Sequence, residues 1–233
     1  MKKLTLTFLI ILFTLTSNVV WSADFQKGLE AAKSGDYATA LREWKPLAEQ
    51  GNARAQSNLG VMYKNGEGVP QDYKTAVKWF TLAAEQGNDV AQNNLGVRYA
   101  LGQGVIQDYE TAVKWSTLAA EQGHKIAQNN LGKKYEQGKG VIQDYETAVK
   151  WYTLAAEQGV ASAQNNLGIM YEQGKGVQQS NINAHMWGNI TSAKGNETGT
   201  SLRDRVESKM GYADISKAQK LARECIAKNY KGC

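Results

Sequence analysis

The hydrophobic and polar positions of this chain repeat every 36 residues. A Leu-Gly pair recurs at that spacing, beginning at Leu59, Leu95, Leu131 and Leu167. A tryptophan in the second half of each unit keeps the same spacing, at Trp79, Trp115, Trp151 and Trp187. The stretch from Gly104 to Trp115 is identical to the stretch from Gly140 to Trp151. A period of this length predicts an array of stacked structural repeats.

Each unit is expected to form two helices. In the unit that begins at Asn88, Ala91, Leu95 and Tyr99 lie four residues apart and predict a first helix over 88–100. Gly102 is placed to end that helix, and Asp108 to cap a second helix over 109–122. Helices of about 13 residues are marginal in isolation, so they need stacked neighbours. The pattern therefore predicts an all-α chain of antiparallel helix pairs.

The two ends of the array differ from its middle. A shortened helix pair is expected over 25–33 and 37–50, and closing helices over 201–210 and 214–229, after a loop at 191–200. The predicted divisions are a signal peptide (1–23), an N-terminal capping pair (24–51), repeats (52–87, 88–123, 124–159 and 160–190) and a C-terminal helical cap (191–233).

The tryptophans are expected in the core, between packed helices. Ser116 stands where the flanking units have Phe80 and Tyr152, which predicts a weak repeat. We therefore expect faster amide exchange in 105–122 than in 141–158, and stabilisation of the protein by Ser116→Tyr.

The first residues have the pattern of a secretory signal peptide. Lys2 and Lys3 precede an uncharged stretch over 4–20, and small residues follow at Ser22 and Ala23. Cleavage after Ser22 fits better than cleavage after Ala23, and an uncleaved anchor is the alternative. We expect a periplasmic or secreted protein, with no stable membrane insertion after signal removal. Without the two lysines the net charge falls from +5 to +3, too little to indicate nucleic acid binding.

The repeat resembles the Sel-one-like repeat family, a relative of the tetratricopeptide repeat. The resemblance rests on the Ala-Gln-x-x-Leu-Gly-x-x-Tyr, Gly-x-Gly-Val and Ala-x-x-Trp signatures and covers about residues 52–190. It implies a right-handed α-solenoid that acts as a scaffold or adaptor and binds a protein or extended peptide on its concave face. A cysteine-rich secreted branch of the family has been attributed β-lactamase or penicillin-binding activity. This chain lacks the repeat cysteines, which puts that activity in doubt here.

Candidate catalytic and metal sites are sparse. The Gly-x-Gly pairs occur four times between helices, which favours turns over a phosphate-binding loop. His124 and His185 are far apart in the sequence, and a metal site needs three or four converging ligands. The sequence holds no Ser-x-x-Lys and no Gly-x-Ser-x-Gly, and Thr75 recurs at Thr111 and Thr147 as a helix-surface position. We therefore expect no catalytic residues, no metal and no cofactor.

Cys225 and Cys233 are the only cysteines. In an oxidising compartment, two cysteines at this spacing near a terminus predict one disulfide that pins the C-terminal cap. The alternative, a redox-active pair, usually has Cys-x-x-Cys spacing.

Asparagines recur inside the first helices, although asparagine is a middling helix former. They stand directly before each Leu-Gly pair and one residue earlier, at Asn58, Asn94, Asn130 and Asn166 and at Asn93, Asn129 and Asn165. We call these seven residues the asparagine ladder. In tetratricopeptide solenoids such as that of O-GlcNAc transferase, an asparagine at the like position binds the backbone of an extended peptide, to which an amide is suited. The alternative is that the ladder bridges neighbouring repeats.

Residues that follow each Leu-Gly pair change from repeat to repeat, which favours a mixed apolar and charged groove. They are Val61, Val97, Lys133 and Ile169, and then Lys64, Ala100, Glu136 and Glu172.

We predict a monomeric, non-enzymatic scaffold that binds a protein or peptide. A β-lactam- or cell-wall-directed hydrolase and a purely structural spacer are the alternatives.

Overall fold

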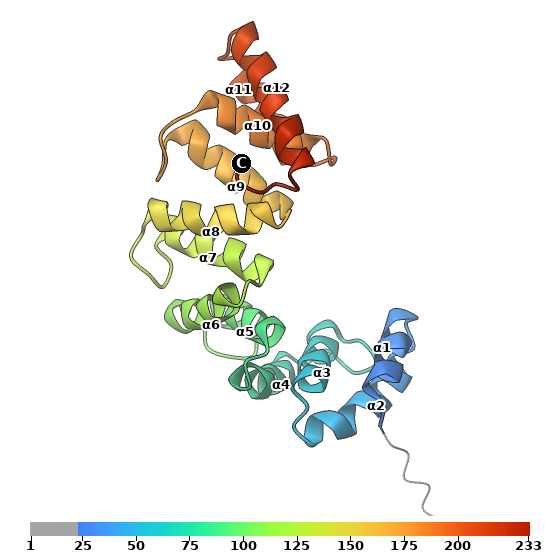
Figure 1. Ribbon diagram of the computed structural model, residues 1–233. Coiled ribbons are helices and arrows are strands. Elements are labelled where there is room, and N and C mark those ends of the chain that lie inside the picture. Colours follow the sequence, from blue (N-terminus) through green and yellow to red (C-terminus); the bar gives the residue numbers. More distant parts are fainter. Residues whose placement is uncertain (1–22) are drawn as a thin grey trace, which may run out of the picture.

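Figure 1 shows helix pairs that follow one another along an elongated, curved stack. The computed structural model describes residues 23–233, and every regular element in that range is an α-helix. The predicted signal sequence lies outside the described residues except for Ala23. The first helices of the pairs are α1 (Phe25–Lys33), α3 (Ala53–Asn65), α5 (Asp89–Leu101), α7 (Lys125–Gln137) and α9 (Ala161–Gln173). The second helices are α2 (Tyr37–Glu49), α4 (Tyr73–Glu85), α6 (Tyr109–Glu121), α8 (Tyr145–Glu157) and α10 (Asn181–Ser192).

Local capping fixes where these helices begin and end. Asp108 accepts hydrogen bonds from the backbone N–H groups of Glu110 and Thr111, at the start of α6. Gly102 ends α5 in the left-handed conformation, with φ of 66°. Gly104 lies against the previous repeat, because a Cβ there would be 2.3 Å from the Tyr73 carbonyl oxygen. The Gly-x-Gly pairs are therefore turns, as the sequence indicates, and the structure shows that they also fit one repeat onto the next.

The core combines many small alanines with fewer large side chains. Ala76, Ala83 and Ala91 are fully buried, and so are Phe80 and Tyr152. The prediction that the four tryptophans lie in the core is right only for Trp187. The other three, Trp79, Trp115 and Trp151, are partly exposed and pack against the edges of the core clusters. Successive residues point about 100° apart around a helix, so the residue after each tryptophan faces the paired helix instead.

The C-terminal cap is more regular than the sequence indicates. The expected loop over 191–200 is wrong, because α10 continues to Ser192 and α11 (Glu197–Glu207) begins soon afterwards. The Asn196 side chain caps α11 by accepting a hydrogen bond from the Gly199 N–H. The hydroxyl group of Thr191 donates to the Trp187 carbonyl, which keeps this polar residue inside the helix. The last helix, α12 (Tyr212–Ala227), packs against α10.

Candidate functional site

Consecutive first helices lie beside one another and form one side of the stack. The Asn130 side-chain amide on α7 donates to the Asn93 Oδ1 on α5, at 3.2 Å. Asn166 on α9 donates to the Asn129 Oδ1 on α7, also at 3.2 Å. We call the side formed by α3, α5, α7 and α9 the first-helix face. Polar side chains therefore join its helices directly.

The asparagine ladder takes up two kinds of position on this face. Asn129 and Asn165 are buried, whereas the other five members are half-buried. Asn94 donates to the Val90 carbonyl of its own helix, at 2.9 Å. The hydrogen bonds from Asn130 and Asn166 bridge neighbouring repeats, which is the structural alternative that the sequence left open. Peptide binding by the ladder stays a prediction.

A second set of amides, which the sequence analysis passed over, joins the repeats more deeply. Gln56, Gln92, Gln128 and Gln164 are buried and form what we call the glutamine ladder. Gln92 donates to the Ala84 carbonyl of the preceding repeat at 3.2 Å and accepts from Gln122 of its own repeat at 2.7 Å. At the last level Lys194 takes the place of that second glutamine and donates to Gln164. The signal was present in the repeated Ala-Gln-x-x-Leu-Gly motif, because a glutamine on the buried face of a helix needs hydrogen-bond partners.

Two hollows open at equivalent places on this side of the stack. The Ser116 hollow has a volume of about 310 Å³ and lies between α5, α6 and α7. Its lining includes Gly96, Val97, Ala100, Leu101, Tyr109, Ser116, Asn130, Lys133, Lys134, Gln137 and Lys139. The Trp44 hollow has a volume of about 230 Å³ and lies between α1, α2 and α3. It is lined by Leu29, Ala32, Lys33, Tyr37, Trp44, Asn58, Val61, Met62 and Glu67.

Charged side chains on this side differ from level to level. Glu172 forms ion pairs with Arg205 at 2.6 Å and Lys209 at 3.2 Å, and the Arg205 hydrogen bonds are the main cause that lowers the pKa of its carboxyl group. Glu136 accepts a hydrogen bond from the Tyr152 hydroxyl group. Burial, together with Glu136, raises the pKa of that hydroxyl group. The last level is therefore closed by α11, whereas lysines surround the hollow between α5 and α7.

The remaining residues singled out in the sequence have structural contacts. The His124 Nδ1 caps α7 by accepting from the Ala127 N–H. His185 is buried, and its Nε2 lies 3.0 Å from the Glu207 carboxylate. Thr75, like Thr111 and Thr147, donates its hydroxyl hydrogen to the capping aspartate of its helix. Within residues 23–233, no three side chains of His, Cys, Asp or Glu type are grouped as metal ligands would be.

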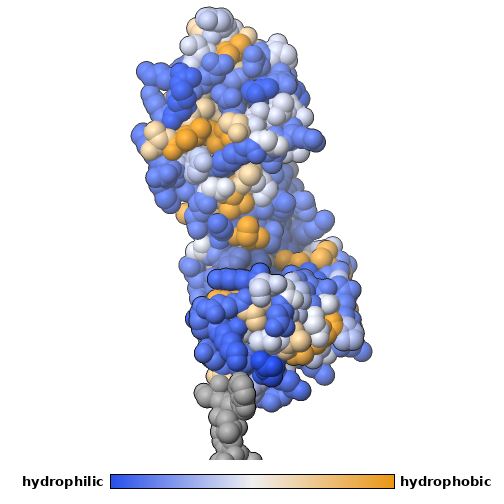
Figure 2. All heavy atoms as spheres, turned by 90° about the vertical axis from the view of Figure 1, so that its right-hand side faces the viewer, coloured by the Kyte–Doolittle hydropathy of each residue, from blue (hydrophilic) through white to orange (hydrophobic). Residues whose placement is uncertain are grey.

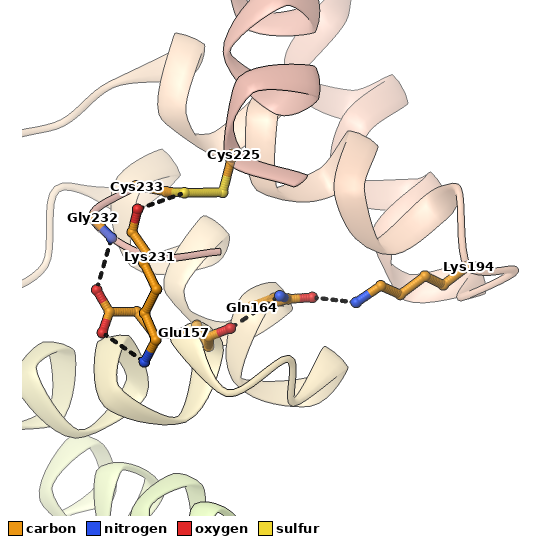
Figure 3. Close-up of a disulfide and its surroundings, with 8 residues drawn as sticks. Glu157, Gln164, Lys194, Cys225, Lys231, Gly232 and Cys233 are labelled. Carbon is orange, nitrogen blue, oxygen red and sulfur yellow. Dashed lines mark hydrogen bonds and ion pairs between the residues drawn. A yellow bond between two sulfur atoms is a disulfide. The ribbon is translucent and has the colours of Figure 1, made fainter. Parts of the chain in front are cut away.

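The C-terminal tail turns back from α12 onto the last repeats (Figure 3). A disulfide joins Cys225 to Cys233, whose Cα atoms are 5.6 Å apart. The Gly232 N–H donates to the Glu157 carboxylate at 3.0 Å, and the Lys231 ammonium group lies 3.7 Å from the same carboxylate. The tail thus contacts α8 as well as the helix from which it extends.

Known families provide an independent comparison for this arrangement. The family model described as Sel1 repeat matches residues 53–88, 89–124, 125–160 and 161–196, which is more than half of the chain. The chain belongs to the Sel1 repeat family. Its α-solenoid fold is the scaffold on which Sel1 repeats generally support protein interaction. The last matched repeat includes all of α10 and also Lys194 after it, which continues the register of the glutamine partners.

Solved structures show the same Sel1 repeat architecture. The protective antigen c5321 of uropathogenic Escherichia coli, which displays an SLR fold, is 34% identical over 88% of this chain, with a TM-score of 0.82. This chain spans only 46% of that structure's length. A Sel1 repeat protein from Oxalobacter formigenes is 30% identical, over 84% of this chain and 85% of its own, with a TM-score of 0.70. A Sel1 repeat protein from Klebsiella pneumoniae, at 24% identity over 78% of this chain and 91% of its own, shares the fold with a TM-score of 0.52.

No curated protein matches this Sel1 repeat chain. Among residues 23–233, the helices are too short or too polar to reach across a lipid bilayer.

Proposed function

We propose that this Sel1 repeat protein is a non-catalytic scaffold of the cell envelope that binds an extended segment of a partner protein along its first-helix face. The observation that carries the proposal is the pair of hollows at equivalent places on that side, each lined by an asparagine of the ladder. Asn58 lines one hollow and Asn130 the other. A repeated hollow with a repeated amide suits a ligand that is itself repetitive, such as an extended polypeptide backbone.

The bridging role of the asparagines is compatible with peptide binding. An asparagine amide has two N–H donors and one carbonyl acceptor. The bond from Asn130 to Asn93 uses one donor of Asn130. The second donor and the carbonyl oxygen of Asn130 then serve a ligand's backbone, while the bridge holds the amide in place.

The face that binds the ligand is tested by peptide selection combined with cross-linking. Peptides enriched from an unbiased phage-displayed library are added to protein that carries a photoreactive residue at Gln137 or at Leu118. Both positions are exposed, and Leu118 lies on the second helix α6, away from the first-helix face. Cross-links at Gln137 and not at Leu118 support the proposal. Enrichment of no peptide, or equal cross-linking at both positions, overturns it.

The non-catalytic part of the proposal has its own test. The purified protein is incubated with a chromogenic β-lactam and with cell-wall fragments. We expect no turnover above that of a heat-denatured sample. Turnover that a single side-chain substitution removes would overturn this part and support the hydrolase alternative.

An envelope location is supported by the signal-peptide pattern and the bonded cysteine pair. Mass spectrometry of the non-reduced protein from a periplasmic or culture-medium fraction is expected to find a peptide that links Cys225 to Cys233. A protein recovered only from the cytosolic fraction, with both thiols free, would contradict the envelope location.

A further inference from the structure

The Ser116 hollow marks a level at which the stack lacks an aromatic ring. The equivalent side chains in the neighbouring repeats are Phe80 and Tyr152, and the equivalent in the N-terminal pair is Trp44. All three rings are buried, and Ser116 is only 1% exposed. Position 116 is therefore as deeply buried as its equivalents, while most of the volume of one side chain is missing.

The course of the Tyr152 side chain shows where the missing ring would lie. Its ring passes over Gly132, where a Cβ would lie 2.7 Å from the Tyr152 Cδ1, and its hydroxyl group reaches Glu136. One repeat earlier, the residues at these positions are Gly96 and Ala100. Both line the hollow. The hollow is thus the space that an aromatic side chain at position 116 would fill, and it is open to ligands on the first-helix side.

Lysines surround this space. Lys133, Lys134 and Lys139 line it, and the Lys134 and Lys139 ammonium groups lie 5.7 and 5.9 Å from the centre of the Tyr109 ring. Lys134 is half-buried, and burial, with repulsion from Lys139, lowers the pKa of its ammonium group. No carboxylate of the described chain is among the lining residues. A carboxylate from a ligand would supply the charge that these lysines lack nearby.

The Trp44 hollow provides a comparison within the same chain. Val61, Met62 and Glu67 stand at the positions of Lys133, Lys134 and Lys139. Its ring position is filled by Trp44, which is 4% exposed. The same backbone frame therefore has an open aromatic position with a basic rim at one level. At the other level the position is filled and the rim is mixed, because it includes Lys33 as well as Val61 and Glu67.

We propose that the Ser116 hollow binds an aromatic side chain of the partner protein whose neighbours in sequence are acidic. The proposal rests on the proposed function and names the chemistry of the bound segment. The ring enters the space beside Gly96 and Ala100, as Tyr152 does beside Gly132 and Glu136. Aromatic side chains bury a large area and are common anchors of interfaces. The flanking carboxylates bind the lysines at the rim.

Calorimetric titration with a short peptide tests this proposal. The probe is an acetylated and amidated pentapeptide with one tyrosine between two glutamates on either side. Two control peptides replace the tyrosine with alanine or the four glutamates with lysine. We expect measurable affinity for the probe alone, which weakens when NaCl is raised from about 0.05 to about 0.5 M, because salt screens exposed charges.

Variants of the full protein locate the binding. Ser116→Phe fills the hollow, and the affinity for the probe is expected to fall by about tenfold or more, a loss of about 1.4 kcal/mol in binding per factor of ten. The double variant Lys133→Gln, Lys134→Gln is expected to weaken binding and to reduce its salt dependence. Lys150→Gln, which removes an exposed lysine of the second helix α8 outside both hollows, is the matched control and should leave the affinity unchanged. Circular dichroism melting of each variant shows that it is folded.

The outcomes separate this inference from the function on which it rests. Equal affinity of the wild type and Ser116→Phe for the probe overturns the inference. So does the absence of probe binding by a wild type that still binds library-selected peptides on the first-helix face, and in both cases the proposed function stands. If neither the probe nor any library peptide binds, both proposals are wrong.

Discussion

The Ser116 and Trp44 hollows are the same place in two repeats, and they differ chiefly in one buried side chain and three side chains at the rim. The Trp44 indole contacts α1, donates a hydrogen bond to the Phe25 carbonyl at 3.1 Å, and closes the core of the N-terminal pair. Ser116 approaches Gly96 on α5, but its short side chain makes no contact with α5 like that of the Trp44 indole with α1. The hollow is larger by about 80 Å³ at the Ser116 level.

This difference shows how a repeat scaffold gains an open hollow without changing its fold. Both levels have a capping aspartate and a turn glycine before the second helix. The glutamine ladder makes the same kind of contact at these levels or at neighbouring ones. Stability in such arrays is roughly a sum over repeats and their interfaces. One level can therefore lose an aromatic side chain while its neighbours hold the stack together.

The largest expected effect comes from opening the Trp44 hollow. Trp44→Ser removes a buried ring and its hydrogen bond, and the free energy of unfolding should fall by about 3–5 kcal/mol. Urea denaturation measures the loss, and hydrogen exchange should place it in α1 and α2. Trp44→Phe keeps most of the ring and is the matched control. A loss below about 1 kcal/mol, on the same scale, would show that the two levels tolerate the missing ring equally.

The reverse change at the other level is expected to stabilise the protein. Ser116→Phe should raise the free energy of unfolding by about 0.5–2 kcal/mol, as cavity-filling substitutions commonly do. We choose phenylalanine rather than the tyrosine expected from the sequence. Tyr152 donates its hydroxyl hydrogen to Glu136, whereas the equivalent residue one repeat earlier is Ala100, whose side chain has no acceptor. In the wild type, amide exchange should be faster in α6 than in α8, and the variant should reduce the difference. Equal exchange in the two wild-type helices would contradict the weak-repeat interpretation.

A smaller effect separates the two ladder asparagines that line the hollows. Asn130 donates to Asn93, whereas no hydrogen bond within residues 23–233 joins the Asn58 side chain to another residue. Both Asn130→Ala and Asn58→Ala gain the same helix propensity. Asn130→Ala should therefore be less stable than Asn58→Ala by about 0.5–1.5 kcal/mol, the net value of one hydrogen bond. Thermal melting of the two variants measures this difference, and identical melting temperatures would show that the bridge does not stabilise the stack.

Exchanging the charges at the two rims should hardly change stability. Lys139→Glu and Glu67→Lys replace exposed or half-buried side chains, and surface substitutions usually alter the free energy of unfolding by about 0.5 kcal/mol or less. Their effects on binding should differ, because only Lys139→Glu places a negative charge beside the open ring position. The glutamate-flanked probe should bind Lys139→Glu more weakly and Glu67→Lys as the wild type. Equal weakening of both would indicate a general effect of net charge.

Acid should act on the two levels alike. The pKa values of the Asp36 and Asp108 carboxyl groups are lowered, first by the hydroxyl groups and then by the backbone N–H groups of Thr39 and Thr111. Each carboxyl group has a lower pKa in the folded state than in the unfolded state. Its stabilisation of the fold is therefore complete at pH values above the unfolded-state pKa, and it is lost as the pH falls through the folded-state pKa. The melting temperature should fall below about pH 4, with amide exchange accelerated in both α2 and α6. Asp108→Asn keeps a cap without a titrating charge, so the acid response of α6 should weaken in this variant while that of α2 remains.

The sequence by itself determined the repeat, the helix pairs and most of their ends. The 36-residue period can be read directly from the sequence. The capping aspartates and turn glycines contact residues close to them in the chain, so their roles can also be recognised from the sequence. The helices expected over 88–100 and 109–122 are α5 and α6 to within one residue at each end. The C-terminal cap was predicted less well. The sequence analysis passed over two local contacts there, the Asn196 cap of α11 and the hydrogen bond that keeps Thr191 inside α10.

Only the tertiary structure decided which repeated residues face the core and which line the hollows. Trp79 and Phe80 are neighbours in sequence, yet the tryptophan is partly exposed and the phenylalanine is fully buried. The bridge between Asn130 and Asn93 and the open space beside Ser116 depend on how one helix pair lies against the next. Packing across repeats joins residues more than thirty positions apart, and a periodic sequence shows their spacing but not the direction in which each side chain points.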